Sequence, residues 1–279
     1  MKTSNNPNSF KKLLYRLICV PKCASCRERL SPFAKNDSLN QGYLCLCDKC
    51  MEKWQAACVQ MCHTCSSVAA DCTCMPRKKT FVQPSIPSLF FYHPDTSRTE
   101  SKVIYTLKHK NHVELFEYIS AELCPKLESL LSELEISLDD CILTYIPRTR
   151  AAQIKNGFDQ GEILCRTMAR DLFATYAPLL IREGGVEQKQ LSKNERKQNA
   201  DKAIFANTEL KGVRIQKDGK NISDLLYKKT VIIIEDIITT GATVARAIKC
   251  LKDAGAENVL VCAVARSEIS IDKKKSAGK

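Results

Sequence analysis

The stretch Val231–Thr243 reads VIIIEDIITTGAT. Its aliphatic run is rich in β-branched residues and predicts a buried strand. Two carboxylates, Glu235 and Asp236, follow the run, and a turn rich in threonine then leads into a segment with helical periodicity. In a parallel α/β sheet, ligands bind beyond the carboxyl ends of the strands, so this stretch predicts a ligand site.

The turn Thr239–Thr243 predicts a cradle for one phosphate group. It offers backbone N–H groups, a helix N-terminus and up to three hydroxyls, and Gly241 permits a left-handed backbone or a close approach to the phosphate. The two carboxylates suit vicinal sugar hydroxyls, so a phosphate and a diol together describe a ribose 5-phosphate. A buried strand capped by two acids before a threonine-rich helix start is the alternative, and residue types alone do not separate the two.

Strands and helices alternate around this stretch. The runs 89–93, 141–146 and 258–265 predict further strands, and the runs 157–176 and 243–256 predict helices. A helical pattern also covers 96–135, with a break expected at Pro125. The polar run 183–202 shows no period and predicts a mobile loop or a plain linker. We therefore expect an α/β domain with a mainly parallel sheet flanked by helices.

Of the 16 cysteines, 11 lie before residue 75. Paired spacing at this density predicts structural zinc rather than disulfides, because two CxxC turns close one tetrahedral site. Sequential pairing gives one site from Cys23, Cys26, Cys47 and Cys50, and a second from Cys62, Cys65, Cys72 and Cys74. The single residue between Cys72 and Cys74 leaves Cys45, Cys58 and His63 as substitute ligands. Redox pairs, or a reduced cysteine-rich domain, are the alternatives.

The N-terminal run FKKLLYRLICVPKC, residues 10–23, is basic and then apolar. Arg16 interrupts its apolar part and no small-residue cleavage site follows, so we expect a short amphipathic helix rather than a signal peptide. No apolar run reaches the roughly 18 residues that a membrane span needs. We therefore expect a cytoplasmic protein.

The formal net charge is +12. Two Zn(Cys)4 sites would lower it to about +8, since each carries four thiolates and one dication. Such a surface attracts the phosphates of nucleic acids or of smaller ligands, although a solvated face of lysine and arginine gives the same count.

The stretch VIIIEDIITTGAT resembles the signature of the type I phosphoribosyltransferases, which bind phosphoribosyl pyrophosphate (PRPP), usually with Mg²⁺. The resemblance implies that Glu235 and Asp236 are the catalytic carboxylates and bind the ribose hydroxyls, and that Thr239–Thr243 hold the 5-phosphate. Arg148 and Arg150 would lie in the pyrophosphate loop. The implied PRPP-binding residues are Glu235, Asp236, Ile237, Ile238, Thr239, Thr240, Gly241, Ala242, Thr243, Arg148, Thr149 and Arg150.

Three further segments, together with the paired cysteines, resemble the ComF/GntX family, in which a double zinc module precedes a type I phosphoribosyltransferase domain. These segments are YTLKHKNHVEL (105–115), IPRTRAAQIKNGFDQGEILCR (146–166) and QLSKNERKQNADKAIF (190–205). The resemblance covers residues 10–266 and places Lys108 in a hood and Gln190, Arg196 and Asn199 in a flap. Asp159, Glu235 and the Cys72-x-Cys74 pair depart from the family pattern.

The resemblance implies a zinc module at 1–82 and a phosphoribosyltransferase-like domain at 83–279. It implies PRPP as ligand, Mg²⁺ with PRPP, two structural Zn²⁺ ions, and transfer of ribose 5-phosphate to an unknown acceptor. The alternative is a competence accessory protein that handles incoming single-stranded DNA with DNA-uptake or recombination proteins, the PRPP site being a sensor. In a third reading the zinc module is only a scaffold.

Overall fold

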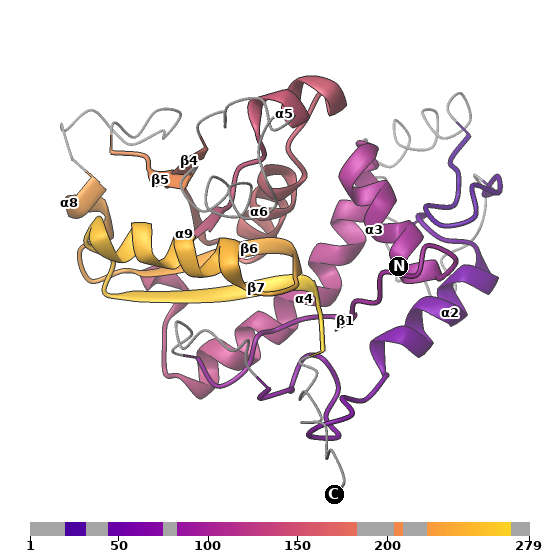
Figure 1. Ribbon diagram of the computed structural model, residues 1–279, viewed down its shortest axis with the longest axis horizontal. Helices are drawn as coiled ribbons and strands as arrows, with labels where there is room; N and C mark the ends of the chain where they lie inside the picture. The colour runs from indigo at the N-terminus through magenta and orange to yellow at the C-terminus, as the bar shows by residue number, and fades with distance from the viewer. Residues whose placement is uncertain (1–19, 32–43, 75–82, 183–203, 209–221, 269–279) are drawn as a thin grey trace, which may run out of the picture.

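A five-stranded parallel sheet forms the centre of the protein in a computed structural model that describes residues 20–31, 44–74, 83–182, 204–208 and 222–268 (Figure 1). The strand order is β1–β7–β6–β2–β3, and each neighbouring pair is parallel. The strands are β1 (Phe90–Phe91), β2 (Cys141–Tyr145), β3 (Thr175–Tyr176), β6 (Thr230–Ile238) and β7 (Asn258–Arg266).

Both faces of the sheet are covered, as the aliphatic strand sequences require. On one face, Ile232 and Ile234 pack with buried residues of α4 (Val113–Glu133) and α6 (Gln160–Asp171). On the other face, Val231 and Ile233 pack with α9 (Ala242–Asp253), which lies along β6 and β7 in Figure 1. Alternate residues of β6 therefore enter two separate cores.

The connections after β2 and β6 leave the sheet in opposite directions. From β2 the chain passes through α5 (Arg150–Asn156) and α6 to β3, whereas from β6 it passes through α9 to β7 on the other side. Since β2 and β6 are neighbours, the loops at their carboxyl ends diverge around a crevice. This is the topological switch point at which open α/β sheets bind ligands.

A small antiparallel pair, β4 (Leu180–Arg182) and β5 (Ile204–Ala206), packs beside α9. The remaining elements are α2 (Asp48–Cys58), α3 (Thr99–His109), the 3-10 turn Leu138–Asp140 and α8 (Ile222–Leu226). No helix in the described part of the chain combines the length and the apolar content that crossing a membrane requires.

The cysteine-rich segment contains two matching turns. Lys22 bridges Arg29 in the first turn and Met61 bridges Val68 in the second, both in antiparallel fashion. Arg27 and Ser66, each just after a CxxC motif, both take a positive φ (68° and 56°). The doubled cysteine pattern therefore corresponds to a repeated backbone motif.

This segment shares a core with the sheet. Trp54 of α2 is 1% exposed, and its ring lies 5.1 Å from that of Phe90 in β1 and 6.3 Å from that of Tyr118 in α4. One cluster of buried residues includes both Met51 and Leu143, from α2 and from the middle of the sheet. The boundary expected between residues 82 and 83 stays a prediction, and the two parts pack as one unit.

Two predicted element boundaries were wrong. Pro125 does not interrupt its helix but lies inside α4, on the exposed side, while Leu123 and Leu127 hold the buried side of the helix in the core. The helix expected to continue to residue 176 ends at Asp171, because Phe173 takes a positive φ of 54° and the chain then enters β3. The expected N-terminal amphipathic helix lies outside the described residues.

Candidate functional site

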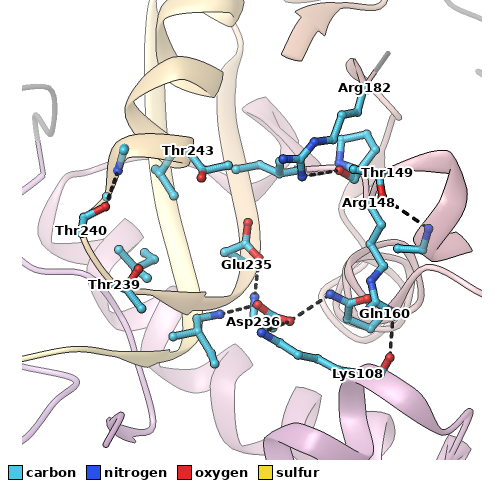
Figure 2. Close-up of a pocket in the computed structure, with 18 residues that line it drawn as sticks. Lys108, Arg148, Thr149, Gln160, Arg182, Glu235, Asp236, Thr239, Thr240 and Thr243 are labelled. Carbon is cyan, nitrogen blue, oxygen red and sulfur yellow. Dashed lines mark hydrogen bonds and ion pairs between the residues drawn. The ribbon is translucent and has the colours of Figure 1, made fainter. Parts of the chain in front are cut away.

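A pocket of about 310 Å³ opens at the switch point between β2 and β6 (Figure 2). Its charged side chains are three basic residues, Lys108, Arg148 and Arg182, and two acids, Glu235 and Asp236. The other lining residues are Ile146, Pro147, Thr149, Ala152, Gln160, Ile237, Ile238, Thr239, Thr240, Gly241, Ala242, Thr243 and Val244. All nine predicted residues from Glu235 to Thr243 thus meet Arg148, Thr149 and Lys108 at one pocket.

The two carboxylates of β6 have different surroundings. Asp236 is 5% exposed and accepts hydrogen bonds from the Gln160 side-chain amide (2.9 Å, Oδ2) and from the Ile237 backbone N–H (2.7 Å, Oδ1). Lys108 Nζ also lies 3.4 Å from Asp236 Oδ2. Asp236 is therefore held by three protein donors.

Glu235 is more available to a ligand. One of its carboxylate oxygens accepts the backbone N–H of Asp236 at 3.0 Å, and Figure 2 shows the other pointing away from Asp236, toward the side of Thr243 and Arg182. Removal from water, followed by the neighbouring charge of Asp236, raises the pKa of Glu235 well above its ordinary value. A carboxyl group perturbed in this way inside a pocket is typical of functional sites.

The turn after β6 has the geometry of an anion cradle. Gly241 takes the left-handed conformation predicted for it (φ 72°, ψ 3°) and lies directly before α9. The Thr240 hydroxyl accepts the Ala242 backbone N–H at 3.4 Å, which closes the turn. The N-terminal end of α9 is thereby directed into the pocket, where its positive dipole end favours a phosphate.

The loop after β2 supplies basic groups on the opposite wall. Asp159 accepts the Arg148 backbone N–H at 2.8 Å, and Arg148 Nη1 donates to the Lys108 carbonyl at 2.7 Å. Thr149 caps α5, since its hydroxyl accepts the Ala152 N–H at 3.3 Å. Arg150 is exposed on the first turn of α5 and is not one of the pocket-lining residues.

Two polar residues of the pocket were not predicted from the sequence. Gln160 holds Asp236, and its place in the GFDQ segment was the signal that could have found it. Arg182 ends β4, and its Nη1 donates to the Pro147 carbonyl at 3.4 Å. Its Nε is buried with no hydrogen-bond partner among the described residues. No local pattern singles out Arg182. The flap residues Gln190, Arg196 and Asn199 lie outside the described residues.

Two groups of four cysteines lie where the spacing predicted them: Cys23, Cys26, Cys47 and Cys50, and Cys62, Cys65, Cys72 and Cys74. In each group the sulfur atoms lie within 4.8 Å of one another. The distances Cys26–Cys47 (3.6 Å), Cys65–Cys72 (3.6 Å) and Cys62–Cys74 (4.0 Å) suit a tetrahedron, whose edge is about 3.8 Å for Zn–S bonds of 2.3 Å. The sulfur atoms are grouped as the sequential pairing predicts, and both groups could hold structural zinc. The substitutes Cys45, Cys58 and His63 belong to neither group.

The second cysteine group is attached to the end of β7. Arg266 is 2% exposed and donates to the carbonyls of Cys72 (2.9 Å) and Cys74. His63 Nδ1 lies 2.7 Å from a Glu268 carboxylate oxygen. Arg266 also pairs in register with Ile238, the last residue of β6, so this cysteine group adjoins the strand end from which the pocket turn starts.

Comparison with known proteins agrees with this geometry. Residues 169–278 match the family model described as phosphoribosyl transferase domain. None of the curated proteins matches the chain.

Several solved structures are similar at low identity. The allosteric regulatory enzyme of purine biosynthesis is 18% identical (TM-score 0.30), with 58% of this chain covering 26% of that one. A hypoxanthine phosphoribosyltransferase from Staphylococcus aureus is 13% identical (TM-score 0.32; 57% of this chain, 71% of that one). A hypoxanthine-guanine phosphoribosyltransferase from Bacillus anthracis is 12% identical (TM-score 0.32; 57% and 75%).

The predicted fold class is confirmed. The chain forms an α/β domain with a mainly parallel sheet of the phosphoribosyltransferase kind, and two cysteine groups that fit zinc ribbons precede it.

Proposed function

We propose that this protein binds PRPP and is a phosphoribosyltransferase-like member of the ComF/GntX family. The observation that carries the proposal is the convergence of an acid pair, a hydroxyl-lined helix start and two arginines on one pocket at the switch point. Paired reduced cysteines fit a cytoplasmic protein.

The pocket offers a separate group for each part of PRPP. The 5-phosphate is held by the turn Thr239–Thr243 and the start of α9, and the ribose hydroxyls lie at Glu235. The pyrophosphate is bound on the opposite wall by Arg148, Thr149 and Arg182. Arg182 fits this role because its buried Nε has no other partner among the described residues.

In transfer, the bond from C1 of the ribose to the pyrophosphate oxygen breaks, and the electron pair leaves with pyrophosphate. Arg148 and Arg182 stabilise the charge that develops on the leaving group, and the carboxylates of β6 favour the cationic sugar. An acceptor nucleophile, which the pocket does not identify, then forms the new bond at C1.

Calorimetric titration tests the proposal by competition. PRPP is titrated into the protein alone and after saturation with ribose 5-phosphate or with adenine. We expect ribose 5-phosphate to compete, because it keeps the diol and the 5-phosphate, whereas adenine leaves PRPP binding unchanged. A protein that binds none of the three, or binds adenine at the PRPP site, contradicts the proposal.

A second candidate function, binding of incoming single-stranded DNA, is favoured by one surface feature. Tyr105 of α3 is 62% exposed, and its ring lies 4.4 Å from that of His109. Exposed lysines, Lys102 and Lys110, lie on either side of this pair along the chain. An aromatic surface among cations is how proteins stack and hold single strands.

If this surface binds DNA, Tyr105→Ala should weaken the affinity by about 1–3 kcal/mol, the range for loss of one stacked base. Neutralising Lys102 and Lys110 should flatten the salt dependence, since fewer counterions are released. Lys252→Ala, on an exposed site of α9, is the control. Affinity that ignores both salt and Tyr105 argues against this function. From the sequence we also expect the basic cluster Arg77, Lys78 and Lys79 to contribute to DNA binding, and this cluster lies outside the described residues.

A further inference from the structure

The two acids of the pocket differ in how much of their charge remains for a ligand. Asp236 is paired with Lys108, and its two oxygens already accept Gln160 and the Ile237 N–H. Glu235 accepts one backbone N–H, and its other oxygen points into the pocket. Of the two carboxylates, Asp236 is therefore the one taken up by protein donors, whereas Glu235 keeps one oxygen directed at the pocket.

Two hydrogen bonds fix the C-terminal part of α3 and so hold Lys108 in this place. Its carbonyl accepts Arg148 Nη1 at 2.7 Å, which ties the last turn of α3 to the loop after β2. Two residues earlier, the Thr106 hydroxyl donates to the Ala24 carbonyl at 2.6 Å and fixes α3 against the first cysteine turn. The Lys108 side chain is 32% exposed, so its amine lies at the pocket wall and not in bulk water.

These contacts bear on the Mg²⁺ that the family resemblance implies. Mg²⁺ takes oxygen ligands at about 2.0–2.1 Å in near-octahedral geometry. At Asp236 Oδ2 the Lys108 ammonium and the Gln160 amide occupy the approach that such an ion would need. The donor set at Asp236 therefore does not fit a divalent cation, and the positive charge there comes from the protein.

We propose that Lys108 takes the place of a divalent cation at the carboxylates of this pocket, so that the ribose 5-phosphate part of the ligand binds without Mg²⁺. Lys108 neutralises Asp236 and Gln160 orients it, which leaves Glu235 as the carboxylate that meets the ribose hydroxyls. This inference rests on the proposed PRPP site and assigns Lys108 to the ribose end of it.

Ribose 5-phosphate is the probe that isolates this end of the site, because it lacks the pyrophosphate that would itself chelate Mg²⁺. Binding is measured calorimetrically with no added divalent cation and again with millimolar Mg²⁺, without chelator, so that the cysteine sites keep their zinc. The proteins compared are wild type, Lys108→Met, Lys108→Arg and the control Lys252→Met, which changes an exposed lysine of α9.

Wild type and Lys252→Met should bind ribose 5-phosphate equally with and without Mg²⁺. Lys108→Met should bind about tenfold or more weakly without Mg²⁺, since it loses a charge-assisted contact in a partly buried site, and added Mg²⁺ should restore part of the loss. Lys108→Arg should retain most of the affinity because it retains the charge.

Two results would overturn the inference. One is wild-type binding of ribose 5-phosphate that depends on Mg²⁺, and the other is a Lys108→Met protein that binds like wild type in both buffers. A wild-type protein that binds neither ribose 5-phosphate nor PRPP in either buffer would instead overturn the proposed function on which the inference rests. A melting curve for each variant shows that the compared proteins are folded.

Discussion

Glu235 is a ligand-site residue whose burial lowers the stability of the folded protein at neutral pH. Because its pKa is raised in the folded protein, the unfolded chain releases this proton at lower pH than the native one. Stability therefore falls as pH rises above the ordinary value of about 4.3, up to the raised pKa. Glu235→Gln removes this loss, so we expect the variant to melt higher than wild type at neutral pH, with a difference that shrinks toward pH 4.5. Thermal unfolding at several pH values measures it, and a difference independent of pH would contradict the account.

Gly241 has a positive φ and also lines the pocket. Gly157 has a similar φ but lies outside the pocket, so the two glycines separate backbone strain from ligand binding. Gly241 and Gly157 both take a positive φ, 72° and 76°, so valine is strained at either position. Only Gly241 lines the pocket. We expect both Gly→Val variants to be destabilised, but only Gly241→Val to lose PRPP binding. Equal loss of binding in the two variants would show that the cradle has no special role.

At the scale of elements, α4 contains an interior proline, Pro125, which lacks the backbone N–H of a regular helix. Pro125 is exposed and its neighbours Leu123 and Leu127 are buried, so Pro125→Ala keeps the packing while restoring a backbone donor. We expect stability to rise by about 1–3 kcal/mol, since an interior proline costs that order of free energy in a helix. Urea unfolding checks this against Ser129→Ala, an exposed control on the same helix. A Pro125→Ala protein that is no more stable would mean that the helix is already relaxed around the ring.

Most of the central sheet could be predicted from sequence because its longer strands, β2, β6 and β7, are nearly continuous runs of apolar residues. The VIIIE run and its helix partner predicted β6 and α9, but β6 continues to Ile238, so Glu235 and Asp236 lie within the strand and not beyond its end. The cysteine spacing predicted both cysteine groups. Arg182 could not be predicted, because a three-residue strand has no readable period and the contact to Pro147 joins distant segments. The pairing of Lys108 with Asp236 also depends on tertiary packing, since no local pattern places α3 beside β6.

Over the whole molecule, the cysteine-rich segment and the sheet share one core through Trp54, Phe90 and Tyr118. From sequence alone we expect the C-terminal domain to stay folded when Cys26 or Cys47 is replaced by serine. The shared core revises that expectation, because loss of the metal would also loosen the packing against β1 and α4.

Arg266 provides a test of this connection. Its guanidinium is buried against the carbonyls of Cys72 and Cys74, so Arg266→Met leaves two carbonyl acceptors unsatisfied and removes a cation beside four thiols that fit a zinc site. We expect elemental analysis to find two zinc ions per wild-type chain and faster release of one of them from the variant. Lys252→Met is the control. Unchanged release from Arg266→Met would mean that the second cysteine group holds its metal independently of the sheet.

The central claim is that the acid pair at the end of β6 binds PRPP, and calorimetric titration of PRPP into wild type, Glu235→Gln and Asp236→Asn tests it most directly. Each substitution keeps the size and shape of its side chain, so the fold should be retained. A charge-assisted hydrogen bond contributes roughly 1.5–3 kcal/mol, so Glu235→Gln, which weakens the contact to the ribose hydroxyls, should lose about ten- to a hundredfold in affinity. Asp236→Asn should also lose affinity, because it removes the charge that holds Lys108 at the acid pair. If both variants bind PRPP like wild type, the carboxylates are structural and the claim is wrong.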